Sequence, residues 1–352
     1  MITTLSLEEF LIRSAGNPVL DVRSPSEYQQ AHIPGAYNLP LFTDEERKIV
    51  GTAYKQQSRK HAIRHGLDFF GVKMRAMVEE AERLLKAPAF KNQAPVLFVH
   101  CWRGGMRSNA VAWLLDVYGF EVCLLEGGYK TFRNWVLDQF EKDYPLKIVG
   151  GYTGSGKTLI LSQLEKEGET VIDLEKIASH KGSAFGALGQ PPQPRQEMFE
   201  NLLAVALQNA AASGRTIWLE DESQRIGVLN IPAPFWQTMR QKPVYFIDIP
   251  FDPRLDYITT EYGCHEKERL VNAIIRIQKR LGPMETKTAI GHLLENDHRE
   301  AFRILLAYYD RLYGKALYNR ENIGSLLNKI PVSSVDTVSN TKSLLACQSV
   351  ST

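Results

Sequence analysis

Short apolar runs alternate with longer amphipathic stretches along the first half of this chain. Their lengths are those of buried strands. They lie at 17–23, 96–99 and 122–125. Residues Ser108 to Tyr118 show the apolar spacing of a helix, and Gly119 suits its C-terminal end. A longer helical pattern extends from Asp44 to about Ala87. Strands and helices that alternate in this way predict a parallel α/β sheet.

The pattern restarts after a charged linker, residues 138–145, which ends in proline. Four further apolar runs predict buried strands, and two of them carry acidic residues at their carboxyl ends. These runs lie at 146–150, 171–173, 216–221 and 244–249. The chain is helical in character from Pro253 to about Tyr318. Residues 332–352 are rich in Ser, Thr and small polar residues, so we expect this tail to be disordered.

The length of 352 residues exceeds what one hydrophobic core usually organises, so we expect two domains. The first, residues 1–140, is predicted to be an α/β domain with a helical insertion at about 44–93. The second, residues 146–330, is predicted to be an α/β domain with a helical C-terminal part. Hydrophobic residues make up 44% of the chain and charged residues 23%, as in a soluble globular protein.

Composition excludes little about binding partners. The formal net charge of +2 argues neither for nor against nucleic acid, because only local clusters of charge would count. No apolar run approaches the roughly 20 residues that cross a bilayer, and the N-terminus lacks the features of a signal peptide. The four cysteines are scattered without a CxxC pair, which suggests neither a zinc site nor a disulfide framework. We therefore expect a reducing, cytoplasmic location.

A cysteine stands directly between a predicted strand and a predicted helix, at Cys101. Backbone N–H groups converge at such a position and the helix dipole favours an anion, so the thiol pKa falls and the thiolate forms. Cys101 is therefore the predicted catalytic nucleophile, whereas Cys123 lies in an apolar strand and is expected to be an inert core residue. The predicted anion-binding residues of the loop are Arg103, Gly104, Gly105, Arg107 and Ser108.

The first domain resembles the rhodanese (sulfurtransferase) family over roughly residues 5 to 140, apart from the helical insertion. The motifs that carry the resemblance stand in the family's order. They are Asp21-Val22-Arg23, Glu27, His32-Ile33-Pro34-Gly35-Ala36, the Cys101 loop and Leu125-Glu126-Gly127-Gly128-Tyr129. The resemblance implies that Cys101 carries a chalcogen, as a persulfide or its selenium equivalent.

The Cys101 loop is longer than the common sulfurtransferase pattern, since five residues separate Cys101 from Arg107. The arrangement His-Cys-x5-Arg-Ser is also the signature of cysteine phosphatases of the tyrosine and dual-specificity kind. A loop of this length leaves room for a tetrahedral oxyanion above the sulfur. A phosphatase would also need a general acid for its leaving group, and the sequence does not identify one. The loop suits either phosphate esters or a phosphorus–chalcogen donor.

A second anion-binding loop, Gly151 to Thr158, fits G-x-x-x-x-G-K-[ST] between a predicted strand and a predicted helix, the context of a P-loop. Lys157 would neutralise a diphosphate and Thr158 could ligate Mg²⁺. The fold class is thus a P-loop NTPase-like α/β domain after the rhodanese-like one. The predicted diphosphate-binding residues are Gly151, Thr153, Gly154, Ser155, Gly156, Lys157 and Thr158. Asp221 is the candidate metal-orienting acid, with Asp173 as its rival. Nothing in the motif specifies ATP.

The pairing of these loops resembles the bacterial tRNA 2-selenouridine synthases. The matching segments are Val50–Lys55 in the insertion, Cys101–Ser108 and Gly150–Thr158. The resemblance implies an enzyme that acts on tRNA and converts wobble 5-substituted 2-thiouridine to 2-selenouridine. Selenophosphate would be the selenium donor, and geranyl diphosphate would form an S-geranyl intermediate. No tightly bound cofactor is implied, although Mg²⁺ at Thr158 would suit the diphosphate.

This chemistry agrees with the loops, because a thiocarbonyl is a poor leaving group that S-alkylation converts into a good one. The P-loop would hold geranyl diphosphate for alkylation, and the Cys101 loop would hold selenophosphate for selenation. Two clusters of basic residues are candidates for backbone phosphates of tRNA. They are Arg59, Lys60 and Arg64 in the insertion, and Arg276, Lys279 and Arg280 near the C-terminus. Each cluster alone is also compatible with an ordinary solvated helix face.

Three other functions remain open from the sequence. A persulfide sulfurtransferase fused to an NTP-dependent kinase would use the same two loops. A regulatory binding module would sense an anion at Cys101 and switch with a nucleotide at the P-loop. A cysteine phosphatase would use Cys101 on phosphate esters.

Overall fold

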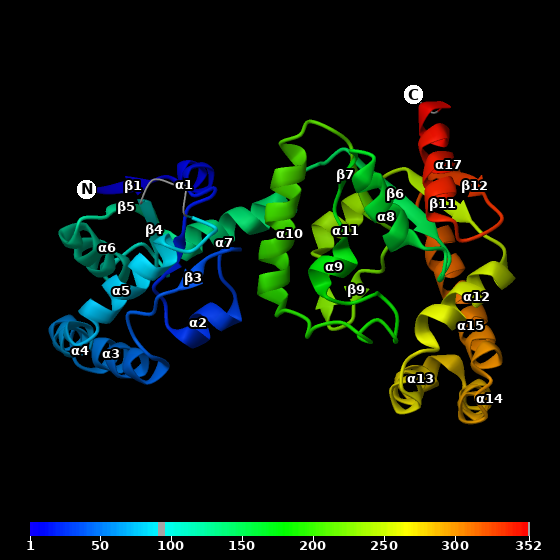
Figure 1. The fold of residues 1–352 in the computed structure, drawn as a ribbon, viewed down its shortest axis with the longest axis horizontal. Coiled ribbons are helices and arrows are strands. Elements are labelled where there is room, and N and C mark those ends of the chain that lie inside the picture. The colour runs from blue at the N-terminus through cyan, green and yellow to red at the C-terminus, as the bar shows by residue number, and fades with distance from the viewer. Residues whose placement is uncertain (91–95, 351–352) are drawn as a thin grey trace. The chain divides into compact units, whose positions relative to one another are not determined.

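The computed structural model describes residues 1–90 and 96–350, and it divides into two compact units, Met1–Asp138 and Gln139–Thr352 (Figure 1). The predicted insertion and tail therefore extend at 91–93 and 351–352 beyond the described residues. Within the described ranges, no helix is both long enough and apolar enough to cross a bilayer.

In the described part of the first unit, five parallel strands form a sheet in the order β1-β5-β4-β2-β3. The strands are β1 (Ile2–Leu5), β2 (Val19–Asp21), β3 (Tyr37–Asn38), β4 (Val96–His100) and β5 (Glu121–Leu125). The central strand β4 is buried from Leu97 to His100 and leads directly into Cys101. The helices outside the insertion are α1 (Leu7–Arg13), α2 (Pro25–Gln30), α6 (Met106–Tyr118) and α7 (Gly128–Gln139).

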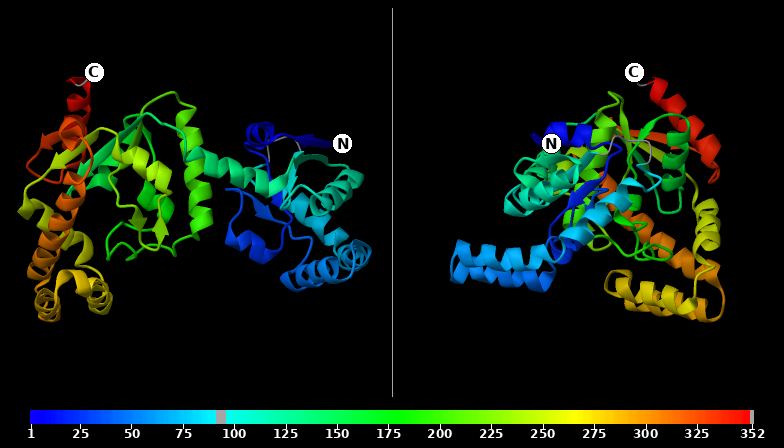
Figure 2. Two further views of the ribbon diagram at one scale, coloured as in Figure 1. Left: turned by 180° about the vertical axis from the view of Figure 1, so that it is seen from behind. Right: turned by 60° about the vertical axis from the view of Figure 1, so that its left-hand side comes forward.

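The predicted helical insertion contains three successive helices. They are α3 (Asp44–Gln56), α4 (Arg59–Gly71) and α5 (Met74–Leu85). Thr43 and Glu46 form a reciprocal capping box at the start of α3, as expected for a Thr-x-x-Glu sequence. Helices α3 and α4 lie side by side and extend away from the sheet of their unit (Figure 2). Helix α5 buries Met77, Val78 and Ala81 in the core of the unit.

The described part of the second unit holds a sheet of five parallel strands in the order β12-β11-β6-β8-β7. They are β6 (Leu146–Gly151), β7 (Thr170–Val171), β8 (Ile217–Glu220), β11 (Val244–Asp248) and β12 (Leu327–Pro331). Strands β9 (Arg225–Ile226) and β10 (Leu229–Asn230) form a separate antiparallel pair. Strand β6 is the central strand of this sheet. The loop that follows it lies at the carboxyl ends of the strands, where ligands of open α/β sheets bind.

Helices surround this sheet and form a separate helical part near the C-terminus. The helices of the α/β part are α8 (Lys157–Lys166), α9 (Leu174–Ala178), α10 (Gln196–Ala211), α11 (Ala233–Arg240) and α16 (Ile323–Leu326). The helical part consists of α12 (Phe251–Tyr262), α13 (Lys267–Leu281), α14 (Pro283–Leu294) and α15 (His298–Tyr318). These four pack around buried residues such as Leu255, Leu270, Ile274 and Phe302.

The prediction of a disordered tail is wrong. Residues Thr337–Val350 form helix α17, which packs on α8 and beside β11 and β12 (Figure 1). Its Leu344 is fully buried in the sheet's apolar cluster. The hydroxyls of Thr341 and Ser343 donate to carbonyls one turn earlier in the helix. The composition was misleading because these polar side chains are satisfied locally while one apolar edge of the helix is buried.

Candidate functional sites

The Cys101 loop joins the end of β4 to the start of α6, with Gly105 as the N-cap of the helix. Cys101 is buried, and its Sγ lies 3.3 Å from the hydroxyl oxygen of Ser108. That hydroxyl also lies 3.1 Å from the carbonyl oxygen of Gly105, so its single proton can be donated either to this carbonyl or to the thiolate. The sulfur therefore has a polar neighbour and a helix N-terminus beside it, both of which favour an anion.

The surroundings of Cys101 stabilise its thiolate. Burial alone would raise its pKa, but hydrogen bonds from the Ser108 hydroxyl and the Arg103 backbone N–H, with the charge of Arg107, lower the pKa below its ordinary value. By contrast, burial raises the pKa of Cys123, which lies inside β5. Cys101 is thus the cysteine suited to nucleophilic chemistry.

The backbone at Gly127 and Gly128, after β5, lies close to the backbone of the Cys101 loop. Gly128 has φ +63°, and a Cβ there would lie 2.4 Å from the carbonyl oxygen of Cys101. The backbone N–H of Tyr129 donates to that same oxygen at 2.8 Å. Only glycine allows this approach, so the Glu-Gly-Gly-Tyr segment sets the shape of the loop around the sulfur.

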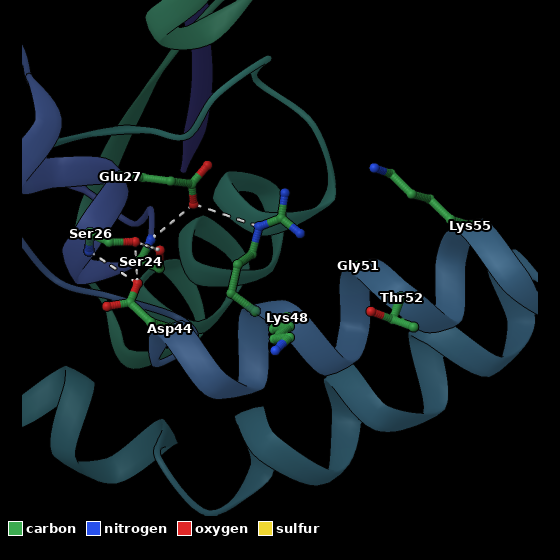
Figure 3. A pocket seen from close by; sticks show the side chains of 9 residues that line it. Ser24, Ser26, Glu27, Asp44, Lys48, Gly51, Thr52 and Lys55 are labelled. Atoms are coloured by element: carbon green, nitrogen blue, oxygen red, sulfur yellow. Dashed lines mark hydrogen bonds and ion pairs between the residues drawn. The ribbon is translucent and has the colours of Figure 1, made fainter.

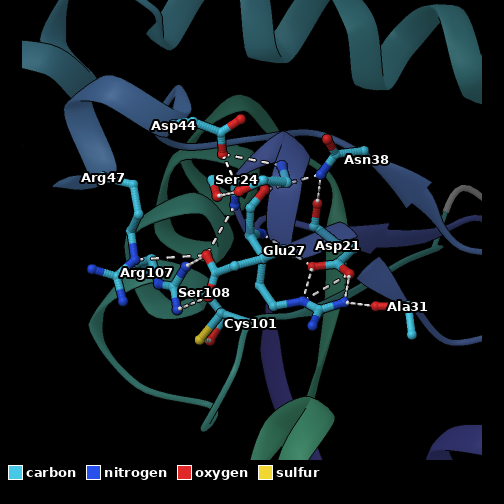
Figure 4. Close-up of polar contacts among 12 residues, drawn as sticks. Asp21, Ser24, Glu27, Ala31, Asn38, Asp44, Arg47, Cys101, Arg107 and Ser108 are labelled. Carbon is cyan, nitrogen blue, oxygen red and sulfur yellow. Dashed lines mark hydrogen bonds and ion pairs between the residues drawn. The ribbon is translucent and has the colours of Figure 1, made fainter. Parts of the chain in front are cut away.

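Glu27 on α2 connects the loop to the insertion (Figure 4). Its carboxylate accepts from Nη1 of Arg107 at 2.6 Å and lies 3.6 Å from Nε of Arg47 on α3. The guanidinium of Arg47 lies against Gly51, where a Cβ would be 2.8 Å from its Nη1. A glycine inside a helix lowers the stability of the helix by about 1 kcal/mol relative to alanine. At Gly51, the space that an alanine side chain would fill is occupied by the guanidinium of Arg47.

A polar pocket of about 390 Å³ lies between α2 and α3, next to this ion pair (Figure 3). Its lining residues are Ser24, Ser26, Glu27, Asp44, Arg47, Lys48, Gly51, Thr52 and Lys55. The carboxylate of Asp44 accepts from the N–H and the hydroxyl of Ser26. Three basic and two acidic side chains line this pocket.

The P-loop joins β6 to α8, and Gly156 is the N-cap of that helix. Gly154 has φ +81°, and a Cβ there would lie 2.7 Å from Cδ1 of Ile258. The ammonium of Lys157 donates to the carbonyl of Gly151 at 3.0 Å and so lies over the loop. The helix N-terminus and this cation form the expected site for a diphosphate.

A buried arginine and a half-buried tyrosine of the helical part hydrogen-bond to the P-loop. Arg254 on α12 donates to the carbonyl of Thr153 at 3.0 Å and forms a bidentate ion pair with Asp310, at 2.9 and 2.7 Å. The hydroxyl of Tyr313 on α15 accepts from the N–H of Gly151 at 3.2 Å. The helical part therefore holds the loop in the shape needed for phosphate.

Carboxylates gather beside the end of the P-loop. The hydroxyl of Thr158 donates to Oε2 of Glu175 at 2.8 Å, and the N–H of Glu175 donates to Oε1 of buried Glu220 at 2.8 Å. Glu222 is hydrogen-bonded to Glu175. Burial, together with the negative charge of Glu175, raises the pKa of Glu222 to about 8.

The described residues contain no cluster of three or more His, Cys, Asp or Glu side chains arranged for a metal ion. Mg²⁺ does not require such a cluster, because it usually takes one or two carboxylates and fills the other positions with water and substrate phosphates. Glu175, Glu222 and the Thr158 hydroxyl provide this kind of ligand set next to the P-loop.

Comparison with known proteins covers both units. The family described as "Rhodanese-like domain" matches residues 6–134, and that described as "tRNA 2-selenouridine synthase AAA domain" matches residues 144–327. A protein of Nitrosomonas europaea named tRNA 2-selenouridine synthase is 34% identical over 294 residues, which cover 82% of this chain and 74% of the relative. For the protein of that name from Cupriavidus pinatubonensis, the identity is 33% over 336 residues, covering 85% and 88%.

The relative of the same name from Serratia proteamaculans is 41% identical over 248 residues, which cover 70% of this chain and 64% of the relative. The chain belongs to the tRNA 2-selenouridine synthase family. The predicted fold class is confirmed: a rhodanese-like α/β domain precedes a P-loop-type α/β domain with a helical C-terminal region.

In this family member, the two predicted acids have hydrogen-bond partners other than Thr158. Asp221 is buried in an ion pair with Arg320, and it accepts from the hydroxyl of Tyr313 at 2.6 Å. Its charge is thereby neutralised, and it braces the loop through Tyr313. Asp173 accepts from the N–H of Lys176 at 2.7 Å as the N-cap of α9. The carboxylate that accepts from the Thr158 hydroxyl is that of Glu175.

Glu27, Glu175, Glu222 and Arg254 were not predicted as site residues from the sequence. A usable signal was present for the glutamates of the second unit. Asp173-Leu174-Glu175 and Glu220-Asp221-Glu222 each follow a short apolar run, and acids at neighbouring strand ends converge at one edge of a parallel sheet. Arg254 had no such signal, because it lies on a helix far from the loop in sequence.

Both basic clusters predicted for this family member lie on exposed helix surfaces. Arg59, Lys60 and Arg64 lie on α4, and Nη2 of Arg59 is 3.8 Å from Sδ of Met106, the first residue of α6. The insertion therefore reaches the rim of the Cys101 loop. The other cluster, Arg276, Lys279 and Arg280, lies on one face of α13.

Proposed function

We propose that this chain replaces the sulfur of a wobble 2-thiouridine in tRNA by selenium, using its two loops in succession. The observation that carries the proposal is the pairing, in one chain, of a stabilised thiolate in a loop with five residues between Cys101 and Arg107 and a P-loop. Relatives over most of the chain bear the name tRNA 2-selenouridine synthase, which supports the proposal. A reducing cytoplasm would keep the thiolate of Cys101 free.

The first step is alkylation at the P-loop. The amides of Gly151–Thr158 and the ammonium of Lys157 hold the diphosphate of geranyl diphosphate. The C2 sulfur attacks the allylic carbon, the carbon–oxygen bond breaks, and diphosphate leaves while N3 of the base loses its proton. Because the site binds the leaving group rather than an adenine, the same loop serves transfer of an alkyl group.

The second step is selenation at the Cys101 loop. Selenophosphate is a tetrahedral oxyanion that the loop amides, Arg103 and Arg107 would neutralise, with Ser108 beside the sulfur. Selenium replaces the S-geranyl group at C2, which leaves as geranylthiol. The bound oxyanion would share Arg107 with Glu27, so the loop already holds this arginine in place before the donor binds.

Mass spectrometry of wobble nucleosides after incubation of thiolated tRNA with both donors tests the proposal. We expect S-geranyl-2-thiouridine with geranyl diphosphate alone and 2-selenouridine when selenophosphate is added. Unchanged nucleosides would favour a regulatory binding module. Strong ATP hydrolysis together with sulfur transfer from thiosulfate would favour the sulfurtransferase–kinase, and hydrolysis of an aryl phosphate without tRNA modification would favour a phosphatase.

Alkylation is expected to depend on Mg²⁺ through Glu175, whose carboxylate is bonded to Thr158. A bound Mg²⁺ would neutralise charge on the diphosphate as it leaves. In a Glu175→Gln variant, the Mg²⁺ concentration that gives half-maximal alkylation should rise by about tenfold. Glu167→Gln, an exposed glutamate just after α8, is the matched control and should match the wild type. An unshifted Mg²⁺ dependence in Glu175→Gln would contradict this assignment.

The basic cluster of α4 is expected to bind tRNA backbone phosphates. Replacing Arg59, Lys60 and Arg64 together by alanine should weaken tRNA binding by about tenfold and flatten its salt dependence by about one unit of slope for each phosphate that the variant no longer binds. Filter binding across a salt series measures both effects. The control is Arg75→Ala with Arg83→Ala on α5, where both arginines are exposed and paired with glutamates of the same helix. If the two variants showed equal salt slopes, the basic cluster of α4 would not be a binding site for tRNA phosphates.

A further inference from the structure

We infer that the thiolate of Cys101 attacks the phosphorus of selenophosphate, not its selenium, and forms an S-phosphocysteine while hydrogen selenide is released. The inference rests on the proposed function for the identity of the donor. It assigns to the Cys101 loop a phosphoryl-transfer activity and to Ser108 a role in breaking the phosphocysteine down.

The oxidation states of the atoms decide whether the thiolate attacks phosphorus or selenium. Selenium in selenophosphate is bonded to phosphorus alone and is already fully reduced, so it is a nucleophile rather than an electrophile. A perselenide on Cys101 would need either an oxidant or reduction of phosphorus to phosphite. Neither the chain nor the proposed reaction supplies an oxidant. Attack at phosphorus requires no change in the oxidation state of any atom.

Cys101 first takes the phosphoryl group and releases selenium, and water later restores the thiolate. The thiolate forms a sulfur–phosphorus bond, the phosphorus–selenium bond breaks, and its electron pair stays on selenium, which takes a proton to become hydrogen selenide. Hydrogen selenide attacks C2 of the S-geranyl base, and the carbon–sulfur bond breaks to release geranylthiolate, which takes a proton from solvent. Water then attacks the phosphocysteine, phosphate leaves, and the Cys101 thiolate is restored.

The loop has the parts that phosphoryl transfer requires. Charge in such a transition state spreads over the three equatorial oxygens, and catalysis consists mostly of positioned donors and positive charge. The amides around the sulfur, the N-terminus of α6 and Arg107 provide these. The five residues between Cys101 and Arg107 give the loop the length at which such an oxyanion fits above the sulfur.

The surroundings of the loop also fit the leaving group. A phosphate ester needs a general acid, because an alkoxide leaves poorly. The carboxylate that bonds to the loop, Glu27, is ill suited to act as that acid. Although burial alone would raise its pKa, the hydrogen bond from Arg107 lowers the pKa below its ordinary value. Hydrogen selenide is a far stronger acid than an alcohol, so selenide leaves without such help. The loop therefore suits a phosphorus–selenium bond better than an ester.

Ser108 is placed to act in the final hydrolysis. Its hydroxyl lies 3.3 Å from Sγ of Cys101 and can turn from the Gly105 carbonyl toward the sulfur. When water attacks the phosphocysteine, the thiolate is the leaving group, and a donor at this distance stabilises the negative charge that returns to it. Removal of the hydroxyl should slow hydrolysis more than formation of the phosphocysteine.

Intact-protein mass spectrometry after rapid mixing with selenophosphate, without tRNA, tests the inference. The wild-type chain should gain one phosphoryl group transiently and release selenide, trapped with an alkylating reagent, in equal amounts. Ser108→Ala should retain the phosphoryl group at least about tenfold longer, since a hydrogen bond to a charged group is removed. Cys101→Ala should gain nothing, whereas Cys264→Ser, which replaces an exposed cysteine outside the loop, should behave as the wild type.

The outcomes separate this inference from the proposed function. A mass increase of one selenium atom on Cys101 would overturn the inference, even if selenouridine forms in the complete reaction. Selenouridine formation with no added phosphoryl group in either the wild type or Ser108→Ala would also overturn it. A phosphoryl group that appears on a chain unable to modify tRNA would support the inference for the loop and refute the proposed substrate.

Discussion

A Cys101→Ala variant is expected to stop the reaction at the S-geranylated nucleoside. Selenation should fall by at least about a thousandfold, since the nucleophile that activates the donor is removed. Alkylation should continue at its normal rate, because it depends on the P-loop of the other unit. Mass spectrometry of the wobble nucleosides should therefore show S-geranyl-2-thiouridine in place of 2-selenouridine.

The matched control is Cys123→Ala, which replaces the other cysteine of this unit. Cys123 is fully buried in β5, and burial raises its pKa, so it carries no reactive thiolate. It should yield 2-selenouridine at the normal rate if the chain folds, which a thermal melt verifies. A Cys101→Ala chain that leaves thiouridine unmodified would show that Cys101 also serves alkylation, and the proposed division between the loops would be wrong.

The elements that the sequence predicted well are those buried on both faces. Runs 96–99 and 146–150 became β4 and β6, the strands that lead into the two loops. The edge strands β1 and β12 gave no comparable signal, although the edge strand β7 overlaps the predicted run 171–173. Strand β1 buries only Leu5 and β12 only Ile330, so their sequences lack a continuous apolar run. These two strands form by pairing with β5 and β11, which lie far away in sequence, so the local pattern does not indicate them.

The candidate sites divide in the same way. The residues Cys101–Ser108 and Gly151–Thr158 are contiguous, and a loop between strand and helix determines its own local geometry. Glu27 lies 80 positions from Arg107, and only the pairing of β2 with β4 brings their elements together. Asp221 follows β8 as a metal-orienting acid would, and its ion pair with Arg320 from beyond α15 is a further contact that the sequence did not indicate.

A Lys157→Ala variant is expected to give the opposite result to Cys101→Ala. The ammonium lies 3.0 Å from the carbonyl of Gly151 and is positioned to exchange this contact for the diphosphate oxygens. Without this ammonium, the negative charge that develops on the departing diphosphate is not stabilised. Alkylation should therefore slow by about 10²- to 10³-fold. With thiolated tRNA as substrate, mass spectrometry should then show unmodified 2-thiouridine and no 2-selenouridine.

Supplying tRNA that already carries S-geranyl-2-thiouridine should bypass this block. Lys157→Ala should then form 2-selenouridine at the wild-type rate, because the Cys101 loop is intact and belongs to the other unit. Lys166→Ala, an exposed lysine in the last turn of the same helix, should alkylate normally and so control for a general loss of charge from α8. If Lys157→Ala also fails on the geranylated tRNA, the P-loop acts during selenation as well. The proposed division of the two steps between the loops would then be wrong.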